Sequence, residues 1–251
     1  MKSSRIWLVA NILLPLTALT VVSVVAVCFV SARQNALTDR QILLAHLVVD
    51  VAAANDVLPE SGELARLVQV DPTVVPEVKV GEPETVVATS FDPSECAELW
   101  IDAVPPTLSV ERWGSTSSEG IVLGVATRAQ LYADRPTARA VFERLGVLLG
   151  SCTTVTLRTI ETSAQRTDES AARAIETSAG IPGYKVETRT SFALDNDVQQ
   201  GWHGVTRYYF VGNAIFEFRY WYDAATGAPS WADAESALFE QRIGDLLSST
   251  G

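Results

Sequence analysis

The chain has 251 residues, and its 30 acidic and 19 basic side chains give a net charge of −11 at pH 7. An acidic surface of this kind repels nucleic acid and anionic lipid, so DNA, RNA and membrane-surface binding are excluded as functions. The length and the absence of internal repeats favour one substantial folded domain after the N-terminal segment.

The N-terminal segment 6–30 contains no charged side chain and follows Lys2 and Arg5. A helix over it would be roughly 37 Å long at about 1.5 Å per residue, enough to cross a hydrocarbon core of about 30 Å. The sequence therefore predicts a single-pass protein of the cell membrane. Residues 1–5 would be a cytoplasmic tail, 6–30 the transmembrane anchor and 31–41 a stalk, with the bulk of the chain extracytoplasmic.

Two alternatives for this segment stay open. It could be a cleaved signal peptide, with Val30 and Ala32 as the small residues before the cut. It could also belong to a lipoprotein that is acylated on Cys28. A retained anchor is favoured because the hydrophobic core of a signal peptide is usually only about 7–15 residues long.

Two cysteines, Cys96 and Cys152, follow the anchor, and a pair of cysteines in an exported domain predicts a disulfide bond. A metal site is not expected, because these cysteines and the two histidines, His46 and His203, show no ligand spacing such as CxxC or HxxxH. No cofactor is expected either.

The first elements after the stalk are expected to be a helix and then extended chain. An amphipathic helix is predicted over 42–54, because Leu43, Leu47 and Val51 recur on one face. Residues 55–90 contain four prolines and predict extended segments and turns with little helix. A short helix is predicted within 91–100, with Asp92 as its N-cap and Pro93 at its first position.

The middle of the chain is expected to alternate strands with one long helix. Alternating and β-branched residues predict strands at 108–113, 121–133, 153–160 and 185–194. The helix starts at Asp134-Arg135-Pro136 and ends at Gly150. Its core-facing stripe is Ala138, Val141, Phe142, Leu145, Leu148 and Leu149.

Two further segments complete the prediction. Residues 162–180 are small and polar, and predict either an exposed loop or a poor helix. A closing helix is predicted to begin at the N-cap Ser230. Its inward-facing residues would be Leu238, Phe239, Ile243 and Leu246.

A β-hairpin is predicted over 202–222, because Gly212-Asn213 is a two-residue turn between aromatic and β-branched runs. Such a turn places Val211 opposite Ala214, so that paired residue numbers sum to 425. One face of the hairpin, which carries Val205, Arg207, Tyr209, Phe216, Phe218 and Tyr220, is mainly apolar and should meet helices.

The opposite face of the hairpin mixes aromatic and charged side chains. It is either a solvated sheet face or the wall of a ligand cleft. The candidate ligand-binding residues on it are Trp202, Thr206, Tyr208, Glu217, Arg219 and Trp221.

Several motifs together resemble a known family. They are Pro93-x-x-Cys96, the strand-helix unit from Ala126 to Cys152 with Phe142, Gly201-Trp202, Asn213 with its following strand, and an alanine-rich closing helix. In this order and spacing the chain resembles, over about residues 40–249, the extracellular sensor domain of the PknH-like type. In actinobacteria this domain is found on a serine/threonine kinase and on exported lipoproteins and membrane-anchored proteins.

The resemblance implies an α+β fold for an extracytoplasmic domain at 42–251. Its sheet would be mainly antiparallel, with helices packed on one side and a cleft for an unknown ligand. The family pattern has a second disulfide within the hairpin, where this chain has Gly204 and Trp221. Kinase activity does not carry over, because the GxGxxG, HRD and DFG motifs are missing.

The expected function is that of a sensor-like domain that binds an unidentified small ligand or an envelope partner, without catalysis. A structural cell-envelope protein and a hydrolase are the alternatives. A hydrolase is disfavoured, because the sequence has no G-x-S-x-G motif and only His46 or His203 as a possible base.

Overall fold

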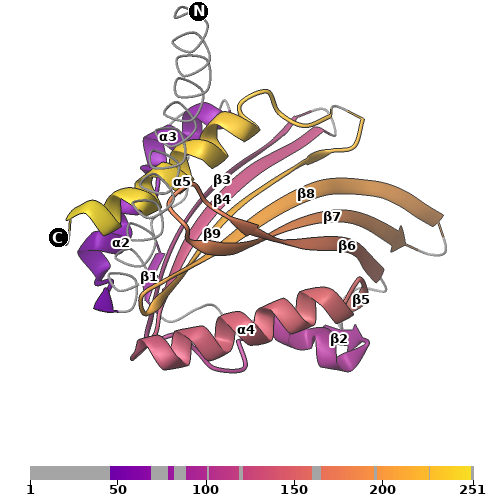
Figure 1. Cartoon of the computed structure of the whole chain (residues 1–251). Helices are drawn as coiled ribbons and strands as arrows, with labels where there is room; N and C mark the ends of the chain where they lie inside the picture. The colour runs from indigo at the N-terminus through magenta and orange to yellow at the C-terminus, as the bar shows by residue number, and fades with distance from the viewer. Residues whose placement is uncertain are drawn as a thin grey trace, which may run out of the picture. The chain divides into compact units, whose positions relative to one another are not determined.

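A nine-stranded antiparallel sheet forms the centre of the part of the chain that the structure describes (Figure 1). The computed structural model describes residues 46–68, 79–81, 89–100, 102–118, 121–159, 165–194, 197–225 and 227–249. The strand order across the sheet is β1-β3-β4-β9-β8-β7-β6-β5-β2. The strands are β1 (Lys79–Gly81), β2 (Thr89–Asp92), β3 (Leu108–Ser118), β4 (Ile121–Leu131), β5 (Thr154–Thr159), β6 (Gln165–Glu176), β7 (Pro182–Leu194), β8 (Asp197–Val211) and β9 (Ala214–Asp223). With the helices below, they confirm the predicted α+β class and its mainly antiparallel sheet.

Helices cover both faces of this sheet, so the prediction of helices on one side is wrong (Figure 1). They are α2 (Val51–Val57), α3 (Ser61–Leu67), the 3₁₀ helix η2 (Ser94–Leu99), α4 (Arg135–Ser151) and α5 (Ala232–Ser249). The face with α2, α3 and α5 holds the larger core, where Phe239 of α5 lies 5.4 Å from the ring of Phe218. On the other face, Phe142 of α4 stacks at 5.5 Å on Phe210. Near its turn the hairpin is apolar on both sides, and each side therefore buries against helices.

The segment before β1 is more helical than its prolines indicate. Residues 47–50 are not helical, and Asp50 accepts a hydrogen bond from the amide of Ala53 at 2.8 Å as the N-cap of α2. The predicted helix over 42–54 is therefore wrong at residues 47–50 and right at 51–54, which belong to α2; residues 42–45 lie outside the described part. Helix α3 begins after Glu60, whose amide donates to Glu63 at 2.8 Å in a capping box. The prediction of little helix over 55–90 is therefore wrong for 61–67, whereas the described residues 79–81 and 89–90 are extended as predicted, and 69–78 and 82–88 lie outside the described part.

Strand β6 replaces the loop or poor helix that was predicted over 162–180. Only one of its residues is buried, and its polar, charged and alanine side chains show no alternation of apolar and polar positions. The strand is held instead by main-chain pairing with β7 along its whole length, and with β5 over Gln165–Glu169. Main-chain hydrogen bonds to neighbouring strands override the helical preference of its alanines.

Three helix boundaries also differ from the predictions. Asp92 ends strand β2 instead of capping a helix, and the 3₁₀ helix η2 follows Pro93 without a side-chain cap. Helix α4 continues through Gly150 to Ser151. Helix α5 begins at Ala232 instead of after Ser230. Its Leu238 is exposed, whereas Phe239, Ile243 and Leu246 are buried as predicted.

The disulfide prediction is confirmed: Cys96 and Cys152 are bonded, with their Cα atoms 5.8 Å apart. The bond joins η2 to the end of α4, and both cysteines are buried beside Leu148 and Val155. In the described part of the chain, no helix has the length and apolar character that a membrane span requires. Segment 6–30 and Cys28 lie outside the described residues.

The predicted hairpin is confirmed with its register, because β8 and β9 pair Val211 with Ala214 and Gly204 with Trp221. The turn residue Asn213 has a second role that the sequence did not reveal. Its buried side chain accepts from the amide of Val49 at 2.7 Å and donates to the carbonyl of Tyr132 at 3.0 Å. One side chain thus joins the turn to the residues before α2 and to the end of β4.

We expect Asn213→Gly to preserve the turn and to lower the free energy of unfolding by about 3 kcal/mol. Glycine suits a two-residue hairpin turn. It would nevertheless leave the amide of Val49 and the carbonyl of Tyr132 buried without these partners, at a cost of about 1–3 kcal/mol each. Denaturant unfolding of the full chain measures the difference. A loss below about 1 kcal/mol would show that the two hydrogen bonds are not stabilising.

Candidate ligand-binding cavity

The six candidate residues of the hairpin all point to the same side of the sheet. On β8, Trp202, Thr206 and Tyr208 are separated by even intervals, as Glu217, Arg219 and Trp221 are on β9, and alternate residues of a strand share a face. The register places Thr206 beside Arg219 and Tyr208 beside Glu217. The structure therefore brings together all six residues named from the sequence.

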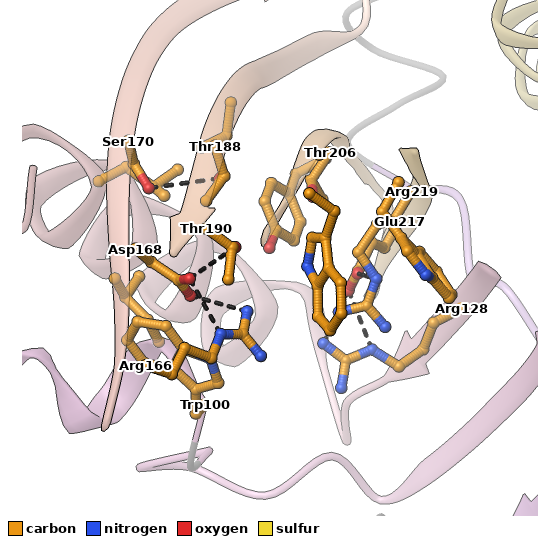
Figure 2. A pocket seen from close by; sticks show the side chains of 17 residues that line it. Trp100, Arg128, Arg166, Asp168, Ser170, Thr188, Thr190, Thr206, Glu217 and Arg219 are labelled. Carbon is orange, nitrogen blue, oxygen red and sulfur yellow. Dashed lines mark hydrogen bonds and ion pairs between the residues drawn. The ribbon is translucent and has the colours of Figure 1, made fainter. Parts of the chain in front are cut away.

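These residues line a cavity of about 420 Å³ (Figure 2). Neighbouring strands extend its wall, with Arg128 from β4, Thr188 and Thr190 from β7, and Asp168 from β6. The opposite wall comes from the disulfide-linked elements, as Leu99 of η2, the following Trp100 and Leu149 of α4. A volume of this size and a mixed polar and aromatic lining are typical of small-molecule sites.

The first charged cluster in the cavity is centred on Glu217, whose side chain is almost fully buried. Both Nε and Nη2 of Arg128 donate to Oε2 of Glu217, at 3.1 and 2.8 Å. Arg219 lies 3.7 Å from the other carboxylate oxygen and stacks over the ring of Trp221 at 5.6 Å. One carboxylate is therefore shared by two guanidinium groups.

The second charged cluster is centred on Asp168, on the other side of the cavity in Figure 2. Arg166 donates to its two oxygens at 2.9 and 2.8 Å, and Thr190 donates to Oδ1 at 2.7 Å. Asp168 is only 3% exposed, so this bidentate pair with a hydroxyl supplies the partners that a buried carboxylate requires.

Electrostatics keep the groups around Glu217 charged and the neighbouring phenol neutral. Burial by itself raises the pKa of Glu217, but Arg128 and Arg219 lower that pKa below its ordinary value of 4.5. Burial likewise opposes the charge of Arg128, but Glu217 raises the Arg128 pKa above its usual range. Burial, and then the charge of Glu217, raise the pKa of Tyr208. At neutral pH the cavity therefore presents an ion pair beside a phenol that can donate a hydrogen bond.

The ring of Trp221 covers Gly124 of β4 and leaves Gly204 open. A Cβ on Gly124 would lie 2.1 Å from Cε2 and Cζ2 of Trp221. On Gly204, the nearest atoms to such a Cβ would be 3.8 and 3.9 Å away, and none belongs to Trp221. The missing side chain of Gly204 thus leaves room in the cavity wall.

Four important residues of the cavity were not predicted: Arg128, Arg166, Asp168 and Trp100. Arg166 and Asp168 lie in β6, which the sequence did not show to be a strand. Among the described residues, no group of three or more His, Cys, Asp and Glu side chains is placed to hold a metal ion. His203 lies against Tyr222, with ring centroids 5.7 Å apart, and is not among the residues that line the cavity.

Known proteins relate to this chain through structure. No family model matches the sequence, and no curated protein sequence matches it. The extracellular domain of PknH from Mycobacterium tuberculosis has a TM-score of 0.54 at 12% identity, covering 81% of this chain and 99% of that chain. The fold is PknH-like. This finding confirms the resemblance at the level of the fold.

A second solved structure is less similar to this chain. It is an uncharacterised protein of Mycobacterium smegmatis, described as the Rv0999 ortholog, with a TM-score of 0.33 at 13% identity. The match covers 73% of this chain and 95% of that chain. Because both identities are low, the roles of the cavity residues rest on the geometry of this chain.

Glu217→Gln should lower the free energy of unfolding by about 2 kcal/mol at pH 7, because the change leaves the half-buried Arg128 without its charged partner. The folded-state pKa of Glu217 is depressed, so its stabilisation is present above pH 4.5 and is lost as the pH falls through the folded value. The difference between wild type and variant should therefore shrink in acid.

Denaturant unfolding at pH 7 and at pH 3 measures this difference. The exposed Glu169 of β6 is a matched control, and Glu169→Gln should change stability by less than about 0.5 kcal/mol at either pH. A difference for Glu217→Gln that stays constant between the two pH values would contradict the prediction.

Gly124→Ala and Gly204→Ala should have unequal effects although both glycines pair with Trp221. Alanine at 124 must displace the Trp221 ring, which we expect to cost about 2 kcal/mol. Alanine at 204 meets only ordinary contacts and should change stability by less than about 0.5 kcal/mol. Thermal unfolding compares the two variants, and equal losses would show that the ring does not lie over Gly124.

Proposed function

We propose that this chain is a membrane-anchored protein whose extracytoplasmic, sensor-like domain binds a small molecule in the cavity of β6–β9. The observation that carries the proposal is the lining of the cavity. Two buried carboxylates, Glu217 and Asp168, are held by arginines in a wall that also exposes tryptophan rings and hydroxyl groups. Fixed polar groups among apolar walls are the usual means by which a site orients a ligand.

The proposed location outside the membrane is supported by three observations. The uncharged segment 6–30 is long enough for an anchor. The bond between Cys96 and Cys152 is typical of oxidising compartments. The structure with a similar fold is itself the extracellular domain of PknH.

Binding without catalysis is favoured by the state of the carboxylates. A carboxyl group that acts as a general acid near neutral pH needs a raised pKa. The pKa of Glu217 is shifted in the opposite direction, and both oxygens of Asp168 are bonded to Arg166. These carboxylates hold arginines in place, which is a positioning role in a binding site.

The proposal is tested by identifying small molecules that remain bound to the full chain after purification from its own envelope. Native mass spectrometry should detect a ligand on the wild-type chain. Gly204→Leu should lose it, because the added side chain extends into the open space of the cavity wall. The matched control is Gly150→Leu on α4, where a Cβ meets nothing within 4 Å, and it should retain the ligand.

Two outcomes would contradict this function. A folded wild-type chain that carries no ligand, and gains no thermal stability from a small-molecule library, would favour a structural role in the envelope. Turnover of the bound molecule, abolished by Glu217→Gln, would favour a hydrolase.

A further inference from the structure

A second cavity lies next to the one described above, and three residues line both cavities. This apolar chamber has a volume of about 320 Å³ and lies between α4 and the residues 98–99 and 102–104. Leu99, Arg128 and Tyr208 line it and also line the first cavity, which is called the polar chamber from here on. A ligand that passed these three side chains would occupy both chambers.

The polar chamber carries an excess of positive charge in an acidic protein. Three arginines line it, Arg128, Arg166 and Arg219, against the two carboxylates of Asp168 and Glu217. Arg166 forms an ion pair with Asp168. Glu217 is therefore the one carboxylate of this lining that pairs with both Arg128 and Arg219.

Arg219 is the cation that is left without a close partner atom. Its side chain is 45% exposed, and its guanidinium group approaches Glu217 no closer than 3.7 Å, whereas Arg128 holds the same carboxylate at 2.8 Å. The pair Arg128–Arg219 therefore has the charge and the free donors to bind one anionic group.

The apolar chamber has a different lining. Aliphatic side chains predominate, among them Val104, Val141, Leu145, Leu148 and Ile215. Its two carboxylates already have partners, because Glu98 pairs with Arg144 at 2.9 Å and Asp102 accepts from the amide of Gln130 at 3.1 Å. Such a chamber favours a hydrocarbon group over an anionic head, because its walls are mainly aliphatic and its polar side includes the carboxylate of Asp102.

We propose that the ligand is an anionic amphiphile. Its carboxylate or phosphate group binds between Arg128 and Arg219, and its hydrocarbon tail passes Tyr208 into the chamber beside α4. This inference rests on the proposed function, because it names the class of ligand for the same site. The ligand is either a dissolved amphiphile or a lipid taken from a bilayer; the shared chemistry is an anionic head on an apolar tail.

The experiment is calorimetric titration of the full chain, kept in solution with phosphatidylcholine nanodiscs, with empty nanodiscs as the blank. Octyl phosphate and octanoate should bind. Inorganic phosphate, 1-octanol and octyltrimethylammonium should bind at least about tenfold more weakly, since each lacks the head, the tail or the correct charge. Binding of octyltrimethylammonium or of phosphate alone with the affinity of octyl phosphate would overturn the inference.

Variants of each chamber have matched controls. Arg219→Gln should weaken binding about tenfold, whereas Arg173→Gln, an exposed arginine of β6 outside both chambers, should not change it. Leu145→Glu places a charge in the half-buried wall of the apolar chamber and should also weaken binding. Val147→Glu places the same charge on the exposed surface of α4 and should not. Circular dichroism verifies that each variant folds.

The outcomes separate this inference from the proposed function. If Gly204→Leu excludes a bound ligand that is neutral or cationic, the inference of an anionic amphiphile is overturned, but the proposed function of the cavity is supported. Octyl phosphate that binds equally to wild type and to Gly204→Leu overturns both. Nanodiscs that contain phosphatidic acid identify the source: competition with octyl phosphate assigns a bilayer lipid, and the lack of competition assigns a dissolved amphiphile.

Discussion

The register between β8 and β9 is the constraint on which the described domain depends. A two-residue turn at Gly212-Asn213 sets it, and Gly212 has a positive φ of 58°. A side chain there would also meet the carbonyl oxygen of Leu47, 2.3 Å from its Cβ, so glycine is required for two reasons. A slip by one residue would send Phe216 and Phe218 away from the helices and turn Glu217 into the core. The register of β8 and β9 therefore determines both the core on one face of the hairpin and the cavity on the other.

What the sequence could predict followed from local signals. The Gly-Asn turn defines the hairpin, and counting outward from it shows that Tyr208 and Glu217 are neighbours on one face. The aspartate and proline that open α4, and the stripe that includes Phe142, are equally local. Each of these features lies within a few residues of its own signal, and each is present in the structure.

The features that the sequence did not reveal depend on contacts between distant segments. Strand β4 pairs with β9, about ninety residues further along, which brings Arg128 to Glu217 and Gly124 under Trp221. Alternation within one strand indicates a shared face, but it does not indicate which strand lies alongside. Asp168 was missed for a related reason: main-chain pairing makes its segment a strand, and its small side chains give no periodic pattern.

The disulfide bond determines in which kind of cellular compartment the cavity can be completed. The wall that faces the sheet consists of η2 and the end of α4, and Cys96–Cys152 is the covalent bond between these two elements. Thiols stay reduced in the cytosol, so at the extracytoplasmic location proposed above this bond would form only after the chain is exported. The hairpin side of the cavity requires no such chemistry, because hydrogen bonds and side-chain packing form it. At that proposed location, the domain would mature in two stages, with the sheet folding first and the opposite wall becoming fixed in the oxidising compartment.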